Sequence, residues 1–234
     1  MKKLVAPAVV GSQVRYGQVL AKQLEKRPRW LDLGCGHQFL PRWAWKPDPA
    51  IFSSLPRLVG VDGDFESLRQ HPGLKDKVSS DILSLPFKDE SFDLITANMV
   101  VEHVLHPEQM LREVRRVLAP GGVFLFHTPN RASPLVTLAA CFPERLKRSL
   151  VGYLEDRCEA DIYPTAYEMN TVRAIRQRSA EAGFHIESCE LVVTEAITQR
   201  LGPLAFFELL YIRLTQTKPL ERLRPDLIVV LRPN

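Results

Sequence analysis

Two short motifs near the start of the chain carry residue types that could bind a nucleoside. Residues 30–36 form an apolar run that contains Asp32 and ends in the closely spaced Gly34 and Gly36. A strand that runs into a glycine turn lets backbone N–H groups approach a ligand, because no Cβ atom is in the way. The next apolar run ends in Asp62, where a carboxylate can accept hydrogen bonds from a ribose diol. Together they predict a nucleoside-containing cofactor at the carboxyl edge of a parallel sheet.

The glycine turn also indicates which cofactors do not fit. A dinucleotide fingerprint, G-x-G-x-x-G/A, needs a small third residue for close packing of helix on strand, and here that position is the bulky Phe39. The chain has no G-x-x-x-x-G-K-[ST] phosphate loop. We therefore expect a nucleoside without a pyrophosphate, although a lone G-x-G also fits an ordinary tight turn.

An ordered series of segments resembles the class I S-adenosylmethionine-dependent methyltransferases. The resemblance is to the small-molecule (type 11) group, which includes ubiquinone and menaquinone biosynthesis enzymes. The segments that carry it are 31–36, 59–62, 80–87, 91–95, 101–104 and 111–122. It covers roughly residues 28–130 and returns weakly near 165–195. It implies S-adenosylmethionine as the cofactor. One departure is Gln38, which stands where the family usually has a third glycine.

The resemblance assigns cofactor roles to residues at successive strand ends. It implies that Asp32 orients the methionine end through the glycine turn, that Asp62 binds the ribose and that Asp81 accepts from the adenine amino group beside Ile82. Asn98 can offer an amide to the methionine end or to the acceptor. The full expected set is Asp32, Gly34, Cys35, Gly36, Asp62, Gly63, Asp81, Ile82 and Asn98. Cys35, between the two glycines, is expected to fill space rather than to react.

Histidines are the candidates for acid–base chemistry. Methyl transfer from a sulfonium mainly needs alignment of donor and acceptor and exclusion of water. A general base helps only where the acceptor carries a proton, as a hydroxyl does. Histidine titrates near neutrality, and His103 and His127 are expected to face the cleft, so we predict them as catalytic residues, with His37 a weaker candidate. No cluster in the sequence has metal-ligand spacing.

The spacing of apolar runs predicts an α/β fold with a doubly wound, mostly parallel sheet. Expected strands are 29–33, 57–61, 77–81, 92–97, 123–127, 184–194 and 226–232, and expected helices are 12–26, 65–70, 107–118 and 165–182. The resemblance implies a seven-stranded Rossmann-like sheet whose last two strands form a hairpin, one of them antiparallel. The last of these helices is expected to begin with a capping box, Thr165 to Glu168.

We expect a single methyltransferase domain over residues 1–234. Its cofactor-binding core would span about 28–130, followed by an insertion over the carboxyl edge at about 131–164 and a C-terminal part at about 165–234. Within the latter, 201–214 is apolar nearly all round. Three interpretations of this segment stay open: burial on the sheet edge, a wall of the acceptor pocket, or contact with a membrane surface or a second copy.

Composition is that of an ordinary globular protein. Hydrophobic residues make up 45% and charged residues 25% of the 234 residues, and the net charge of +4 is mild. The four cysteines form no C-x-x-C pair, which favours reduced thiols in the cytoplasm. No apolar stretch reaches the roughly 20 residues of a membrane span.

The predicted function is therefore methyl transfer from S-adenosylmethionine to a small or lipid-like organic acceptor, with oxygen preferred. One alternative is a nucleic-acid methyltransferase, since Arg173, Arg176 and Arg178 could meet phosphates. The Asn/Asp-Pro-Pro-Tyr/Phe run of amino-methylating enzymes is absent after the fourth strand, however. A second alternative is a binding protein that keeps the fold and has lost activity.

Overall fold

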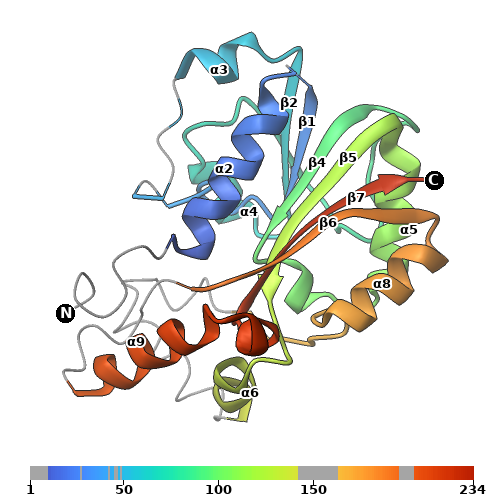
Figure 1. The fold of residues 1–234 in the computed structure, drawn as a ribbon. Helices are drawn as coiled ribbons and strands as arrows, with labels where there is room; N and C mark the ends of the chain where they lie inside the picture. The colour runs from blue at the N-terminus through green and yellow to red at the C-terminus, as the bar shows by residue number, and fades with distance from the viewer. Residues whose placement is uncertain are drawn as a thin grey trace.

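A seven-stranded sheet forms the centre of the molecule (Figure 1). The computed structural model describes residues 10–26, 28–41, 43–44, 47, 49–141, 163–194 and 203–234. In chain order the strands are β1 (Arg29–Leu33), β2 (Arg57–Asp62), β3 (Asp76–Ser79), β4 (Phe92–Asn98), β5 (Leu118–Pro129), β6 (Phe184–Val192) and β7 (Asp226–Pro233). Their order across the sheet is β3-β2-β1-β4-β5-β7-β6.

The pairing confirms the predicted Rossmann-like sheet. Strands β1 to β5 pair in parallel, whereas β7 runs antiparallel to both β5 and β6. From β1 the chain builds outward first on one side, through β2 and β3, and then on the other, through β4 and β5. In open α/β sheets, ligands bind outside the carboxyl ends of the strands at such a switch point. The fold therefore directs attention to the loops after β1, β2 and β4.

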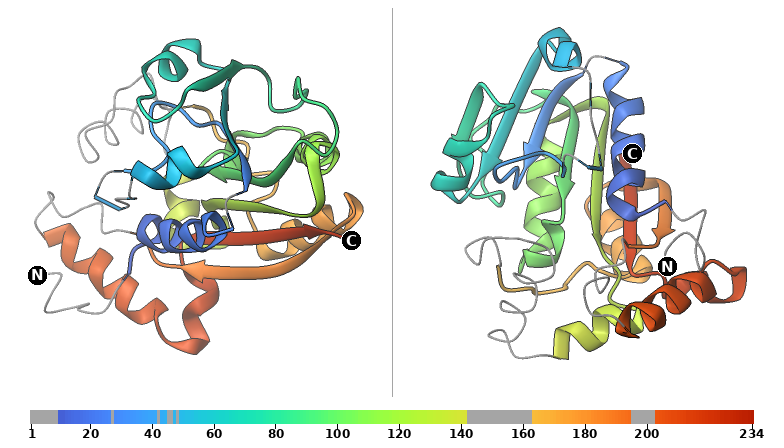
Figure 2. Two further views of the ribbon diagram at one scale, coloured as in Figure 1. Left: turned by 90° about the horizontal axis from the view of Figure 1, so that it is seen from above. Right: turned by 90° about the vertical axis from the view of Figure 1, so that its left-hand side faces the viewer.

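Helices cover both faces of the sheet. They are α2 (Ser12–Leu24), α3 (Pro49–Ser54), α4 (Phe65–Gln70), α5 (Pro107–Val117), α6 (Pro134–Cys141), α8 (Val172–Glu181) and α9 (Pro203–Thr215), with the 3-10 turns η1 (Val101–His103) and η4 (Lys218–Leu223). α2 packs on one face through Tyr16, Leu20 and Leu24, while α5 and α8 pack on the other. Figure 2 shows these two layers from two further sides.

Local signals account for several helix starts. Pro107 occupies the first turn of α5, where its missing N–H costs nothing. The Asp64 side chain caps α4 by accepting from the Glu66 amide at 3.0 Å. The predicted bounds of α4 are those of the structure, and α5 ends one residue earlier than predicted.

The predicted start of the helix before β6 is wrong. α8 begins at Val172, not at residue 165. Thr171 is its cap, because its hydroxyl accepts from the Ala174 amide at 3.1 Å. The expected capping box at Thr165 and Glu168 therefore does not form, and the chain before α8 is available to cross the carboxyl edge.

Two expectations fall partly outside the described residues. Of the insertion predicted at 131–164, the structure describes 131–141, which includes α6, and 163–164. Of the apolar segment 201–214, it describes 203–214 as part of α9. No helix among the described residues is long and apolar enough to cross a membrane.

Candidate functional site

The turn after β1 contains two glycines in the left-handed region of the backbone. Gly34 and Gly36 both have positive φ, +60° and +51°. A Cβ atom on Gly34 would lie 2.5 Å from Val100 Cγ2, so this glycine is required by packing. A Cβ on Gly36 or on Gly63 would meet nothing within 4 Å. Open space therefore remains beside Gly36 and Gly63, where a ligand can approach the backbone.

Asp62, at the end of β2, joins the two loops that border this space. Its Oδ2 accepts from the Gly36 amide and its Oδ1 from the Asp64 amide, each at 2.8 Å. An ionised carboxylate has about four lone-pair sites, so two acceptor positions remain. The carboxylate is thus fixed in place and still able to receive two hydroxyl groups.

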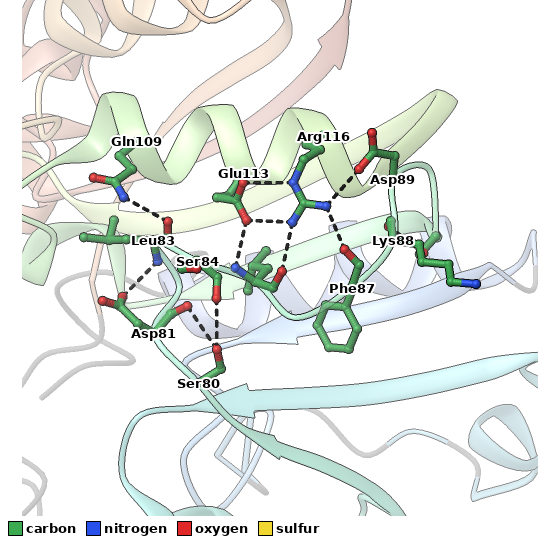
Figure 3. Close-up of polar contacts among 12 residues, drawn as sticks. Ser80, Asp81, Leu83, Ser84, Phe87, Lys88, Asp89, Gln109, Glu113 and Arg116 are labelled. Carbon is green, nitrogen blue, oxygen red and sulfur yellow. Dashed lines mark hydrogen bonds and ion pairs between the residues drawn. The ribbon is translucent and has the colours of Figure 1, made fainter.

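The loop after β3 carries Asp81 and is anchored on α5 (Figure 3). Arg116 donates to the carbonyls of Leu85 at 2.9 Å and Phe87 at 2.7 Å. Glu113 accepts from the Leu85 amide at 2.8 Å, and the neighbouring Arg116 guanidinium lowers the pKa of Glu113. Asp81 lies beyond the strand, which ends at Ser79. Its position therefore depends on α5.

One carboxylate oxygen of Asp81 already accepts a hydrogen bond. Its Oδ1 accepts from the Leu83 amide at 2.8 Å. Gln109 of α5 holds the same loop by donating to the Leu83 carbonyl at 3.1 Å. Ile82, the neighbour of Asp81, is half-buried and packs against the main core. An exposed carboxylate beside a half-buried aliphatic side chain is the combination that an adenine ring requires.

Asp32 points to the α2 side of the sheet and is buried. Thr96 Oγ1 donates to Asp32 Oδ1 and accepts from Trp30 Nε1 at 2.7 Å. Burial raises the pKa of Asp32 to about 7, with the charge of Asp62 adding to the rise and the Thr96 hydrogen bond opposing it. Its carboxylate contacts a strand neighbour rather than the glycine turn, so the predicted role toward the methionine end stays a prediction.

Cys35 fills space between the two glycines. Its side chain is buried and packs with Leu68 and Leu74. Burial raises the pKa of its thiol, and a raised pKa leaves little of the reactive thiolate. The interpretation of Cys35 as a space-filling residue agrees with this geometry.

Asn98 ends β4 with its amide group already engaged. Its Nδ2 donates to Gln13 Oε1 at 3.1 Å and to the Phe39 carbonyl at 3.4 Å. These two acceptors fix the orientation of the amide, so Asn98 Oδ1 accepts from His127 Nδ1 at 2.8 Å. Nδ1 of His127 therefore carries a proton. Helix α2, β4 and β5 meet at Asn98.

His127 is fully buried and stacks on Tyr16, with ring centroids 5.6 Å apart. Its Nε2 lies 3.9 Å from Asp226 Oδ2 and has no hydrogen-bond partner among the described residues. A ring that is closed to solvent and bonded to Asn98 is placed to hold that amide. Its predicted catalytic role stays a prediction.

His103 lies in η1 and is only partly covered. Its Nδ1 is 2.8 Å from the Pro164 carbonyl, an acceptor, so Nδ1 donates and a neutral ring has its lone pair on Nε2. Nε2 lies 3.9 Å from Glu102 Oε1. This tautomer suits a general base, and the nearby carboxyl group would stabilise the ring when it is protonated.

Sequence reasoning missed Glu102 as a site residue. It is buried, and burial raises its pKa. Its Oε2 accepts from Thr128 Oγ1 at 2.9 Å, and Thr128 accepts from Asn170 Nδ2 at 2.6 Å. The available signal was an acid close to apolar residues on both sides, Val101 and Val104. The partners Thr128 and Asn170 are distant in the sequence and gave no signal.

Residues 163–170 cross the carboxyl edge between the two halves of the site. Tyr163 Oη donates to Asp64 Oδ2 at 3.3 Å, and its ring centroid lies 6.0 Å from that of His103. The amides of Ala166 and Tyr167 both donate to the Glu102 carbonyl, at 2.7 and 3.0 Å. This segment therefore connects the ribose side of the predicted cleft to the predicted base.

The described residues also border two open hollows elsewhere. One of about 250 Å³ lies by β6 and is lined by Arg15, Glu190 and Arg224 among others. One of about 140 Å³ is lined by residues that include Asp93 and Gly121. None of the predicted site residues lines either hollow. Neither includes Asn98 or His127 among its lining residues.

Comparison with known proteins agrees with this geometry. Residues 31–126 match a methyltransferase-domain family, type 11. Norajmaline N-methyltransferase of Rauvolfia serpentina is 39% identical over 134 residues, 55% of this chain and 46% of that protein. Malonyl-[acyl-carrier protein] O-methyltransferase of Legionella pneumophila is 33% identical over 106 residues, 43% of this chain and 36% of that protein. The match thus spans less than half the length of either relative.

A solved S-adenosylmethionine-dependent methyltransferase from Mesorhizobium loti has the same fold. The TM-score is 0.55, with 19% identity over 90% of this chain and 96% of that one. The matched region, residues 31–126, contains the glycine turn, Asp62, Asp81 and Asn98. Residues 31–126 thus carry a type 11 methyltransferase domain, and the described residues have the fold of a solved S-adenosylmethionine-dependent methyltransferase.

Proposed function

We propose that this protein transfers the methyl group of S-adenosylmethionine to an oxygen atom of a small or lipid-like organic acceptor. The observation that carries the proposal is the carboxylate of Asp62. It is held by the Gly36 and Asp64 amides beside open space at the switch point of the sheet. A fixed acceptor pair at that place is what a ribose diol requires.

The residues present fit this cofactor. Asp62 would hold the ribose hydroxyls, Asp81 the adenine amino group and Ile82 one face of the ring. The turn from Gly34 to Gly36 would receive the methionine end, with Asn98 nearby. When bound, S-adenosylmethionine supplies a methyl group on a sulfonium, whose sulfur is a very good leaving group. The protein then has to align the acceptor and exclude water.

His103 would serve as the general base. Its Nδ1 proton is committed to the Pro164 carbonyl, which leaves Nε2 to take a proton from an acceptor hydroxyl. The carboxyl group of Glu102 lies close enough to stabilise the charged ring. We assign His127 a positioning role, because it is buried and its contact is with Asn98.

The preference for oxygen rests on His103 and on one of the two relatives. The Legionella relative is an O-methyltransferase, whereas the plant relative is an N-methyltransferase. Transfer from tritium-labelled cofactor decides the acceptor class. We expect label in organic extracts of a cell lysate. Label confined to bulk RNA or DNA would overturn the proposal in favour of the nucleic-acid alternative.

The arginines behind that alternative are only partly available. Arg178 forms ion pairs with Glu108 at 3.0 Å and with Glu168 at 3.3 Å. Arg173 and Arg176 are exposed on α8. A phosphate would thus have to compete with two carboxylates for one of the three cations.

Calorimetric titration tests the cofactor directly. S-adenosylmethionine should bind with a saturable heat and NAD should give none. Binding of NAD in its place would indicate a dehydrogenase. If neither cofactor binds, the result would support the alternative of a binding protein that keeps the fold and has lost the activity.

A further inference from the structure

Helix α9 exposes a row of apolar side chains to solvent, although its opposite side already packs on the protein. Its buried positions are Glu208, Leu209, Ile212 and Thr215. Its exposed positions include Phe206 (48% exposed), Phe207 (65%), Leu210 (37%) and Leu214 (48%). Single exposed apolar residues are common, but a continuous apolar face on a helix indicates a surface that binds a partner or a membrane.

The exposed residues form one continuous face. At 3.6 residues per turn, Phe206, Leu210 and Leu214 fall in a single row, with Phe207 beside it and Arg213 at its other border. The acid of this helix, Glu208, lies on the buried side. Among the described side chains, the outward face of α9 thus combines two aromatic rings and two leucines, with Arg213 at its border.

Helix α6 extends this surface. Its sequence, from Pro134 to Cys141, has no charged residue and none of its side chains is buried; Leu138 is 59% exposed. Ser133, just before α6, hydrogen bonds to Tyr211 of α9 at 2.9 Å. Figure 1 and the right-hand view of Figure 2 show the two helices next to each other beyond the carboxyl edge. We call the exposed side chains of these helices the α6–α9 face.

We propose that the α6–α9 face docks on an anionic lipid bilayer, with the helices lying in the plane of the membrane surface. Apolar side chains would enter the boundary between headgroups and acyl chains, and the cations would meet lipid phosphates. Exposed Lys218 and Arg222 of η4 follow Arg213 along the chain, against one exposed acid, Glu221. The net charge of the whole chain is +4.

Charge favours a bilayer over a second copy of the chain. In a two-fold dimer the same surface meets itself, so Lys218 and Arg222, which outnumber the exposed Glu221 of η4, would approach their own copies. Like charges across an interface are unfavourable. Lipid phosphates supply the opposite charge.

The face also lies at the edge where the cleft is predicted. α6 follows the carboxyl end of β5, and α9 leads through η4 into the start of β7. Docking would hold the loops around Asn98 and His103 close to the lipid surface. If the proposed function is correct, an amphiphilic acceptor could pass from the bilayer to the site. Vesicle binding itself does not depend on methyl transfer.

Flotation with lipid vesicles tests the proposal on the full chain. We expect binding to vesicles of equal parts phosphatidylcholine and phosphatidylglycerol, and much less to phosphatidylcholine alone. A Phe206→Ser/Phe207→Ser variant should lose roughly tenfold or more of the binding, since two exposed rings leave the interface. Phe65→Ser is the matched control, because Phe65 is 60% exposed on α4, at the other end of the sheet.

Two charge-reversal variants separate the electrostatic contribution of this face to vesicle binding from that of the net charge. Arg213→Glu should weaken binding to the anionic vesicles several-fold. Arg112→Glu, on an exposed position of α5, changes the net charge equally and should have a smaller effect. Equal losses would mean that the net charge alone, and not this face, attracts the vesicles.

Three further outcomes overturn the proposal. One is no binding to either kind of vesicle, and another is binding that the double variant leaves unchanged. The third is a dimer by light scattering that the double variant converts to a monomer, which would assign the face to a second copy. Calorimetry with S-adenosylmethionine on the same samples shows separately whether the proposed function stands. Circular dichroism shows that each variant is folded.

Discussion

The two sides of the carboxyl edge are built in different ways. On the cofactor side, after β1, β2 and β3, carboxylates and backbone amides bind each other within short loops. Asp62 holds two amides, and Arg116 and Glu113 fix the loop that carries Asp81. On the other side, where the acceptor is proposed to bind, α6 and α9 expose apolar side chains, and the crossing segment 163–170 is held by a few contacts to Glu102, His103 and Asp64.

The difference shows which part of the site is prepared before a ligand arrives. A cofactor common to a whole family can be met by a rigid set of acceptors, because its shape does not change. Acceptors differ between members, so their surface comes from insertions after the common strands, and fold alone does not determine function. The predictions below test this division, beginning with the largest expected effect.

The acceptor side should contain the residue on which the rate depends most. His103→Ala is expected to lower kcat about 10²- to 10⁴-fold, the usual contribution of a general base. Binding of S-adenosylmethionine should change little. His103→Asn keeps a donor toward the Pro164 carbonyl and should be equally slow. Initial rates with labelled cofactor measure this, with His106→Ala as the control, since His106 is exposed three residues away. Equal rates for His103→Ala and His106→Ala would rule out the base.

Asp32 should make the stability of the protein depend on pH. Its pKa is raised from 3.8 to about 7 in the folded protein, because the carboxyl group is buried. As the pH rises, the folded state therefore keeps this proton to a higher pH than the unfolded state does. The contribution to stability is full below about pH 4 and is lost as the pH rises through 7. At pH 8 the free energy of unfolding of Asp32→Asn should exceed that of the parent protein by up to about 4 kcal/mol. At low pH the two proteins should be about equally stable.

Urea unfolding at a series of pH values measures this effect. Asp93→Asn is the opposing control, because Arg29 lowers the pKa of Asp93 and its loss should cost stability at neutral pH rather than at low pH. A parent and an Asp32→Asn protein with parallel pH profiles would contradict the prediction.

The cofactor side should lose affinity when its fixed acceptor is removed. Asp62→Ala is expected to weaken binding of S-adenosylmethionine about 10- to 100-fold, since charge-assisted hydrogen bonds are worth roughly 1.5–3 kcal/mol. Calorimetric titration measures the change. Asp76→Ala, an exposed acid at the start of β3, should bind as the parent does. An Asp62→Ala protein with parental affinity would remove the basis of the proposed function.

The smallest effect is expected where support is indirect. Arg116→Lys keeps the charge but loses the forked donors that hold Leu85, Phe87 and Glu113 together. The loop that carries Asp81 should loosen, and cofactor affinity should fall up to about tenfold, or roughly 1 kcal/mol. Arg115→Lys on the same helix is the control. Faster amide exchange at residues 83–87 should accompany the loss, and its absence would show that the loop does not depend on Arg116.

Sequence patterns were sufficient wherever local chemistry determines the structure. The apolar runs predicted all seven strands, and proline at the start of α5 marked that helix. The seven-stranded Rossmann-like sheet with a hairpin of the last two strands, however, came from the resemblance rather than from periodicity, and the order of the strands was not predicted. Asp62 and Asp81 could be predicted as neighbours at one edge of the sheet, because each follows an expected parallel strand and parallel strands end at the same edge.

Local patterns failed where two alternatives look alike. Thr165 to Glu168 and Thr171 are both reasonable helix starts in the sequence. The backbone amides of Ala166 and Tyr167 are instead bound by the Glu102 carbonyl, more than 60 residues earlier in the chain. Tyr167 also has φ of +56°, which a helix does not allow. Such a contact cannot be read from a window of neighbouring residues.

The buried polar contacts of the site had no local signal either. Asn98 contacts Gln13, 85 residues away, and Asp32 contacts Thr96, 64 residues away. Each partner is an ordinary polar residue by itself. Only the pairing of strands and the packing of α2 on the sheet bring them together.

The double use of Asp62 has a consequence for how binding is driven. Its two amide contacts form when the chain folds, so the loops after β1 and β2 have already lost their conformational freedom before the cofactor arrives. Binding then does not have to supply that ordering free energy. The interaction free energy of the ribose hydroxyls can appear almost fully as affinity. Insertions after β5 and before β7 can also vary without changing how tightly the methyl donor is held.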